Sequence, residues 1–332
     1  MTLLEAKDLK AYYITKSYGI ERTVHAVDDI SLDVNTDEIL GIAGESGCGK
    51  STLLRVMFGI IRPPLQLIHG TVAYRSGDRS LDLLSLTDDE YRQIRWKELS
   101  YIPQGSMSVL NPLRRVRKTF WDFIDTHRPN TTRREFEDLV TGHLSDLGLP
   151  AEVLDAFPHQ LSGGMRQRVT IALATILKPR LIFADEPTTA LDVIVQSGVI
   201  DLLRRIQAEA RNSLVIVTHD MGIHANLADR IAIMYAGQII EEAPAKQIFG
   251  NPQHPYTKYL IHSLPRIGDK SHRISSPGRP PSLMVPPKGC RFRDRCEQKR
   301  RICREERPLL VSIGENHKVA CFLAVKEGAH AS

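Results

Sequence analysis

A segment near the start of the chain carries the residue types and spacing that hold phosphate groups. Residues 44–51 read Gly-Glu-Ser-Gly-Cys-Gly-Lys-Ser and fit the pattern G-x-x-x-x-G-K-[ST]. The glycines let backbone N–H groups close around phosphate oxygens, and the helix that follows adds its positive dipole end. Lys50 supplies a positive charge to the β- and γ-phosphates, and the Ser51 hydroxyl can ligate Mg²⁺. Because the backbone does the binding, we expect the Cys48 thiol to be inert.

Two adjacent carboxylates farther along the chain complete a nucleotide-hydrolysing set. The apolar run 181–184 ends in Asp185 and Glu186. Asp185 is placed to hold Mg²⁺ through water, and Glu186 is placed to orient and deprotonate an attacking water molecule. Taken alone, two acids at the end of an apolar strand could simply be solvated side chains. Because the same chain also contains the phosphate loop, they predict hydrolysis of a nucleoside triphosphate.

Short apolar segments must position both motifs at the ends of strands. Residues 39–43 predict a buried strand directly before the phosphate loop, and residues 51–59 predict a helix that ends at glycine. Further buried strands are predicted at 181–184 and 214–217. This alternation over residues 1–250 indicates an α/β fold with a largely parallel sheet.

Two helical regions and a linker are also predicted. Apolar residues at three- and four-residue spacing indicate an amphipathic helix between the last two strands, at Val195, Val199, Leu202, Leu203 and Ile206. Residues 116–150 are helical in pattern and more polar, which indicates a small subdomain. Residues 268–289 are rich in proline, glycine and serine, which predicts an extended linker.

The composition is that of an ordinary globular protein. The chain has 332 residues, of which 42% are apolar and 25% charged, which excludes collagen-like and wholly disordered classes. A net charge of +5 without a long block of like charge indicates a solvated basic surface, so no nucleic-acid partner is expected. The first residues turn polar too soon for a secretory segment, and no apolar run of about 18 residues could span a bilayer. We therefore expect a cytoplasmic protein.

A third motif lies between the phosphate loop and the acidic pair. The sequence Leu-Ser-Gly-Gly at 161–164, with Gln104 before it and His219 after it, resembles the nucleotide-binding subunit of ABC transporters. The chemistry agrees, because a serine hydroxyl, glycine N–H groups and a helix dipole make an anion site. The resemblance implies a P-loop NTPase cassette over residues 1–250, with a helical subdomain at about residues 105–165.

The resemblance also implies a role for each matching residue. The 162–164 segment would bind the γ-phosphate of ATP held by an opposite subunit, and 189–192 resembles the D-loop. Met165 departs from the family, which usually has glutamine there. The implied catalytic residues are Glu186, His219, Gln104 and Lys50, and the implied Mg²⁺ residues are Ser51, Gln104 and Asp185. The implied ATP contacts are Tyr13 (with Tyr12 as the alternative for stacking on adenine), Gly44, Ser46, Gly47, Cys48, Gly49, Lys50, Ser51, Thr52, Gln104, Ser162, Gly163, Gly164, Asp192 and His219.

Three further segments resemble the oligopeptide/dipeptide branch of ABC importers. They are Asn-Pro-Gln-His-Pro-Tyr-Thr at 251–257, Gly-Gly-Met-Arg-Gln-Arg at 163–168 and Leu-Asn-Pro at 110–112. The resemblance implies ATP hydrolysis that drives import of di- or oligopeptides, while nickel and oligosaccharides stay open as cargo. Classes outside import are a non-transport ABC ATPase and a nucleic-acid-binding iron–sulfur protein.

The resemblance implies an assembly at the cytoplasmic face of the membrane. The partners would be a second ABC ATPase subunit, two integral-membrane permease subunits and an extracytoplasmic substrate-binding protein. A heterodimer of ATPases is favoured over a homodimer. Gln104 and residues 106–112 would transmit closure of the dimer to the permease.

Four cysteines crowd the end of the chain. Cys290, Cys296, Cys303 and Cys321 lack the closely spaced pairs that zinc sites usually show. Four thiolates on a loop-rich segment can wrap a [4Fe–4S] cluster, and members of the resembled branch carry one at this place. The expectation is therefore a small C-terminal domain, residues 251–332, clipped by a cluster. Zn²⁺ and unliganded reduced thiols stay open as alternatives.

Overall fold

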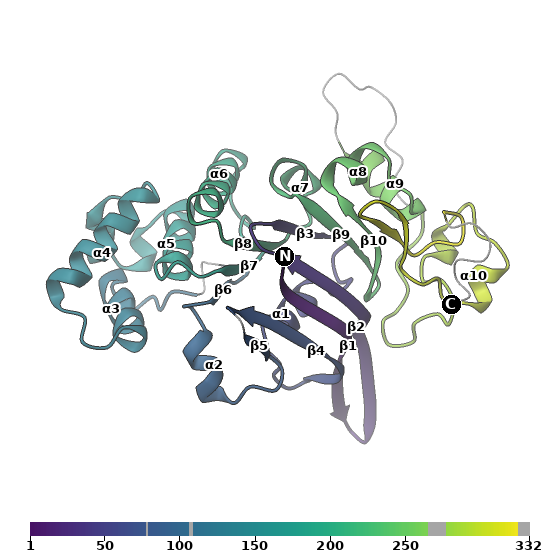
Figure 1. Ribbon diagram of the computed structural model, residues 1–332, viewed down its shortest axis with the longest axis horizontal. Helices are drawn as coiled ribbons and strands as arrows, with labels where there is room; N and C mark the ends of the chain where they lie inside the picture. The colour runs from purple at the N-terminus through teal and green to yellow at the C-terminus, as the bar shows by residue number, and fades with distance from the viewer. Residues whose placement is uncertain (78, 106–108, 265–276, 325–332) are drawn as a thin grey trace. The chain divides into compact units, whose positions relative to one another are not determined.

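The computed structural model divides the chain into two compact units (Figure 1). One unit comprises Met1–Ser85 with Val217–Ser332, and the other comprises Leu86–Ile216. The structure describes residues 1–77, 79–105, 109–264 and 277–324. Parts of the expected linker at 268–289 and of the expected coupling segment at 106–112 therefore lie outside the described residues.

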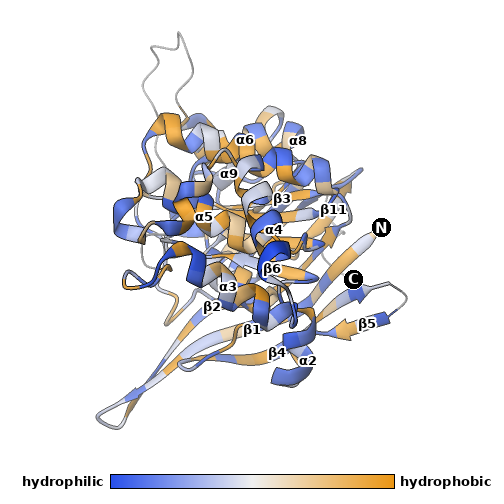
Figure 2. Cartoon of the chain, turned by 90° about the vertical axis from the view of Figure 1, so that its left-hand side faces the viewer, coloured by the Kyte–Doolittle hydropathy of each residue, from blue (hydrophilic) through white to orange (hydrophobic). Residues whose placement is uncertain are grey.

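The first unit begins with an antiparallel sheet in the strand order β2-β1-β4-β5. Its strands are β1 (Thr2–Ser17), β2 (Ile20–Asn35), β4 (Leu65–Ser76) and β5 (Arg79–Asp82). Only Tyr18 and Gly19 connect β1 to β2, and both have a positive φ, 49° and 76°. So short a turn can join only antiparallel strands, so the largely parallel sheet expected over residues 1–250 is wrong for this part. Figure 2 shows hydrophilic and hydrophobic residues interspersed along these strands.

The rest of the first unit is built around a buried parallel pair. Strand β3 (Ile39–Ala43), buried throughout as its apolar run predicts, pairs in parallel with β9 (Arg230–Tyr235). Strand β10 (Gln238–Pro244) continues antiparallel to β9, and the C-terminal strands β12 (His317–Val319) and β11 (Val311–Gly314) follow it. The helices of this unit are α1 (Lys50–Met57), α7 (Met221–Leu227), α8 (Ala245–Gly250), α9 (Pro255–His262) and α10 (Ile302–Glu305).

The second unit is mixed α/β. Strand β6 (Leu99–Ile102) pairs in parallel with β7 (Leu181–Asp185), and β8 (Ser213–Val217) lies next to β7. Its helices are α2 (Asp88–Ile94), α3 (Val116–His127), α4 (Arg133–Asp146), α5 (Gly163–Thr175) and α6 (Val193–Ala210). The predicted strands and helices of this region are confirmed, and the buried residues of α6 include Val199, Leu202 and Leu203.

Within the described ranges, no helix combines the length and the apolar character that crossing a membrane requires.

Candidate nucleotide-binding site

The phosphate loop leaves the end of β3 through two glycines that no other residue could replace without strain. Gly44 has a φ of 151° and Gly49 a φ of 110°. A Cβ atom on Gly44 would lie 2.1 Å from the Met234 carbonyl oxygen, and one on Gly49 would lie 2.0 Å from the Ala26 carbonyl oxygen. The loop is therefore wedged between β2 and β9, which fixes the direction of its backbone N–H groups.

Lys50 begins α1 and folds back over this loop. Its side chain is buried, and Nζ donates hydrogen bonds to the carbonyl oxygens of Gly44 (2.8 Å) and Glu45 (3.0 Å). A buried ammonium needs such partners, and phosphate oxygens could replace them. Gly49 precedes α1, and no side chain caps the first turn of this helix. Its first N–H groups are therefore available to bind phosphate oxygens together with the Lys50 ammonium. Burial raises the pKa of the Cys48 thiol, which keeps it protonated.

The two neighbouring tyrosines face different surroundings. The Tyr13 hydroxyl lies 3.2 Å from the Thr52 hydroxyl on α1, next to the phosphate loop. The Tyr12 hydroxyl instead donates to Asp28 at 2.6 Å, and its ring packs on His25. Tyr13 therefore lies beside the start of α1, whereas Tyr12 is held by Asp28 and His25.

In the second unit, the acidic pair ends β7 in two different environments. Asp185 is fully buried and accepts a 2.9 Å hydrogen bond at Oδ2 from the Tyr101 hydroxyl of β6. Glu186 has a left-handed φ of 47°, which turns it away from the strand, and its Oε2 accepts from the Thr189 hydroxyl at 2.7 Å. Tyr101 was not predicted, because a lone tyrosine carries no spacing pattern, whereas Thr189 belongs to the predicted 189–192 segment, although its contact with Glu186 was not foreseen.

The Leu-Ser-Gly-Gly segment at 161–164, called here the signature segment, and the 189–192 segment come together in the second unit. The Ser162 hydroxyl caps α5 by accepting from the Met165 N–H at 3.2 Å, and the Asp192 carboxylate caps α6 by accepting from the Val195 N–H at 2.9 Å. A Cβ on Gly164 would lie 2.7 Å from Cγ1 of Val195, so the two helix starts pack closely.

The remaining predicted residues lie in loops at the ends of strands. Gln104 is exposed after β6 in the second unit, whereas His219 is exposed between β8 and α7 in the first. The first unit thus groups Tyr13, Gly44, Ser46, Gly47, Cys48, Gly49, Lys50, Ser51 and Thr52 around the start of α1. The second unit carries Gln104, Ser162, Gly163, Gly164, Asp185, Glu186 and Asp192.

Residues from the C-terminal part reach the phosphate loop, which sequence reasoning missed. The Glu45 N–H donates a 2.8 Å hydrogen bond to the hydroxyl of Tyr256, a fully buried residue of α9. The Glu45 carboxylate pairs with both terminal nitrogens of Arg295 at 2.8 Å. These partners are 211 and 250 residues away from Glu45, so no local pattern could have revealed them.

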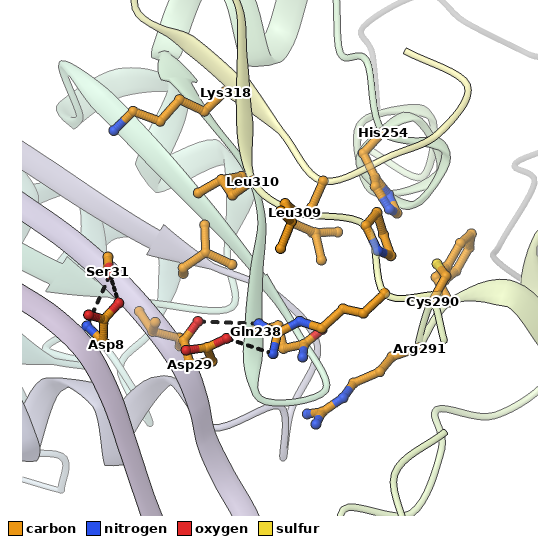
Figure 3. A pocket seen from close by; sticks show the side chains of 17 residues that line it. Asp8, Asp29, Ser31, Gln238, His254, Cys290, Arg291, Leu309, Leu310 and Lys318 are labelled. Carbon is orange, nitrogen blue, oxygen red and sulfur yellow. Dashed lines mark hydrogen bonds and ion pairs between the residues drawn. The ribbon is translucent and has the colours of Figure 1, made fainter. Parts of the chain in front are cut away.

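The C-terminal segment is anchored to the N-terminal sheet beside a pocket (Figure 3). Arg291 donates hydrogen bonds to the Asp28 carboxylate and the Ala236 carbonyl oxygen, and Arg307 pairs with Asp29 at 3.0 Å. Cys290 and the buried ring of His254, both from the C-terminal part of the chain, line the same pocket.

The four C-terminal cysteines line one small cavity. Burial raises the pKa of Cys290 to about 12, and it also raises the pKa of Cys296 and Cys321. The cavity is lined by Cys290, Cys296, Cys303 and Cys321 together with His254 and Phe292. Across the part of the chain that is described, however, no three His, Cys, Asp or Glu side chains form a group that could hold a metal ion. The thiols converge, but their placement gives the expected cluster no support.

Two family models match the chain in separate regions. The model described as "ABC transporter" matches residues 27–189, which include the phosphate loop, the signature segment and the acidic pair. The model described as "Oligopeptide/dipeptide transporter, C-terminal region" matches residues 240–303, which include Tyr256 and Arg295.

Curated relatives and solved structures agree with these matches. The chain is 39% identical to a dipeptide transport ATP-binding protein, DppD, of Caldanaerobacter subterraneus subsp. tengcongensis, with 97% of each chain covered. It is 38% identical to DppD of Bacillus subtilis, over 99% of this chain and 97% of the relative. A dimeric, post-hydrolysis structure of the ATP-binding cassette MJ0796 with ADP and Pi matches 73% of this chain and 99% of that chain, at 27% identity and a TM-score of 0.63. The chain therefore belongs to the ATP-binding proteins of ABC transporters, in the oligopeptide/dipeptide branch.

Proposed function

We propose that this chain hydrolyses ATP at the cytoplasmic face of the membrane to drive import of di- or oligopeptides. The observation that carries the proposal is the phosphate loop with buried Lys50, held against a C-terminal region of the oligopeptide/dipeptide type. Curated relatives that the chain matches nearly end to end are named for dipeptide transport, which supports peptides over nickel or oligosaccharides.

The proposed mechanism assigns charge neutralisation to the loop and proton transfer to Glu186. Lys50 and the N–H groups at the start of α1 bind the β- and γ-phosphates, while the adenine stacks on Tyr13. Glu186 orients a water molecule in line with the γ-phosphate and accepts its proton. His219 and Gln104 contact the γ-phosphate side, and Ser162 with its glycines binds ATP held by a second ATPase subunit.

The donor set fits the Mg²⁺ that accompanies ATP. Ser51, Gln104 and Asp185 offer hydroxyl, amide and carboxylate oxygens, which are the ligands that Mg²⁺ prefers. When bound, the ion neutralises phosphate charge. Asp185 is positioned for this role by the Tyr101 hydroxyl.

The proposed assembly contains two permease subunits, a substrate-binding protein and a second, different ATPase. The cassette would comprise residues 1–250, with a helical subdomain at about 105–165, and residues 251–332 would form the C-terminal domain. In this assembly Gln104 and the 106–112 segment couple the ATPase to the permease.

Reconstitution of the whole transporter tests the function. With its permeases and binding protein in vesicles, we expect peptides to stimulate ATP hydrolysis and to accumulate inside. Lys50→Ala should abolish both activities, whereas Lys246→Ala, at an exposed lysine of α8, should not. Stimulation by nickel or oligosaccharides alone would overturn the peptide assignment and leave the ATPase assignment intact.

We further propose that the four C-terminal thiols hold a [4Fe–4S] cluster. The proposal rests on the donor types in the sequence, since the four cysteines supply the four thiolates that clusters of this type take. Anaerobically purified protein should contain about four iron atoms and acid-labile sulfide. A zinc-loaded or metal-free preparation that is fully folded would contradict the cluster.

A further inference from the structure

We propose that Arg295, in the C-terminal segment, is a positioning residue for ATP binding that acts through Glu45 of the phosphate loop. The proposal rests on the proposed function of that loop. It assigns to the C-terminal region a direct part in shaping the ATP site of its own subunit.

The Arg295 guanidinium is fixed from several sides. Nη1 and Nη2 each donate to one Glu45 carboxylate oxygen at 2.8 Å, and Nε donates to the Pro277 carbonyl oxygen at 2.8 Å. Nη1 also lies 3.2 Å from the Tyr235 hydroxyl. The arginine side chain is 6% exposed and that of Glu45 is 29% exposed. A bidentate pair of this kind fixes geometry as well as charge.

An aromatic cluster holds the arginine in place. The rings of Tyr235, Tyr256 and Phe292 pack on one another with centroid distances from 4.6 to 5.5 Å. The Arg295 guanidinium lies 5.7 Å from the ring centroids of both Tyr235 and Phe292. Lysine at this position could not reproduce the fork that bonds both carboxylate oxygens.

Glu45 is the point where this cluster meets the phosphate loop. Its N–H is bonded to Tyr256, its carboxylate to Arg295, and its carbonyl oxygen to Nζ of Lys50. The carbonyl oxygen also accepts from the Cys48 N–H at 3.3 Å, so Glu45 is held both by its own loop and by the C-terminal part of the chain. Loss of Arg295 would free the loop and leave a carboxylate without its bidentate cation beside the place that takes a triphosphate.

The charge of the Glu45 carboxylate predicts a graded effect on nucleotide binding. An unneutralised carboxylate repels a nucleotide more strongly as the number of phosphates rises. Arg295→Ala should therefore weaken binding of ATP more than that of ADP, and that of ADP more than that of AMP. A defect that unfolds the subunit as a whole would weaken binding of all three nucleotides alike, and the Glu45→Gln rescue separates repulsion by the carboxylate from a local disordering of the loop.

The test is equilibrium binding of the three nucleotides to the purified full-length chain. Arg295→Ala should weaken ATP binding about tenfold, the size expected for loss of a charge-assisted hydrogen bond. Arg295→Lys should recover part of the loss. Glu45→Gln in the Arg295→Ala background should also recover part, because it removes the uncompensated charge and favours folding of the variant.

Two further variants make the outcome decisive. Arg307→Ala removes a different anchor of the same segment, the ion pair with Asp29. It should leave the affinities for ATP, ADP and AMP as they are in the wild type. Lys50→Ala should lose ATP binding if the phosphate loop is the site. Retained binding in Lys50→Ala would overturn the proposed site itself. The role of Arg295 would be overturned if Lys50→Ala loses ATP binding while Arg295→Ala and the double variant both bind nucleotides like the wild type. It would also be overturned if both Arg295→Ala and the double variant lose affinity for ATP, ADP and AMP to the same extent.

Discussion

At the scale of single residues, hydrogen bonds from neighbouring strands and loops hold the acidic groups in place. Asp185 is fully buried, and the Tyr101 hydroxyl satisfies one of its oxygens. A buried carboxylate that loses such a donor is destabilised by its desolvation, so the Tyr101 hydroxyl positions Asp185.

Replacement of Tyr101 by phenylalanine should impair use of Mg²⁺. Loss of one hydrogen bond to a charged group corresponds to about tenfold in an equilibrium. We expect the Mg²⁺ concentration for half-maximal ATP hydrolysis to rise by about this factor in Tyr101→Phe. Tyr18→Phe, at the exposed turn between β1 and β2, is the matched control. An unchanged Mg²⁺ dependence in Tyr101→Phe would show that this hydroxyl does not position Asp185.

At the scale of elements, helix starts and strand ends present the chemistry. The phosphate loop joins β3 to α1, the acidic pair ends β7, and capping residues begin α5 and α6. Because Gly164 lies against Val195, the starts of α5 and α6 are coupled by direct contact. A substitution at the start of one helix should therefore change the packing at the start of the other.

Gly164→Ala tests this coupling. Its Cβ would lie 2.7 Å from Val195, and overpacking of this kind costs about 1–3 kcal/mol of unfolding free energy. Gly163→Ala should be better tolerated, because its Cβ would make an ordinary 3.6 Å contact with Leu191. Denaturant unfolding measures both variants, and Val195→Ala should restore the stability of Gly164→Ala. Failure of that rescue would mean that the two helix starts are not coupled through this contact.

The sequence was most informative where a motif and its element coincide in a short stretch. The strand 39–43, the helix around Val199 and Leu202, and the helices between 116 and 150 follow from local patterns of apolar residues. Contacts between distant parts of the chain could not be predicted in this way. Arg295 reads as one arginine among many, and only the fold brings it to Glu45.

At the scale of the whole molecule, buried histidines make stability depend on pH. Burial lowers the pKa of His224 to about 4 and that of His254 to about 3. The unfolded chain protonates these groups below about pH 6.5, whereas the folded chain does not. Their contribution is therefore complete above that pH and is lost progressively as the pH falls toward the folded-state values.

Thermal unfolding measured between pH 7.5 and 5 tests this dependence. We expect the midpoint temperature of unfolding to stay constant between pH 7.5 and about pH 6.5 and to fall below about pH 6.5. His254→Asn keeps a cap for α9 and removes one titrating group, so its slope should be shallower. His159→Gln, at an exposed histidine, should leave the slope unchanged. A midpoint that rises as the pH falls would contradict the assignment.

The central claim, that this chain is an ATPase with Glu186 as its base, is tested most directly by Glu186→Gln. The substitution keeps the shape and the hydrogen bond from Thr189 but removes the group that accepts a proton from water. Nucleotide bound to the purified variant should be intact ATP, with turnover reduced by a factor of about 10² or more. Wild-type turnover, with ADP as the bound nucleotide, would contradict the account.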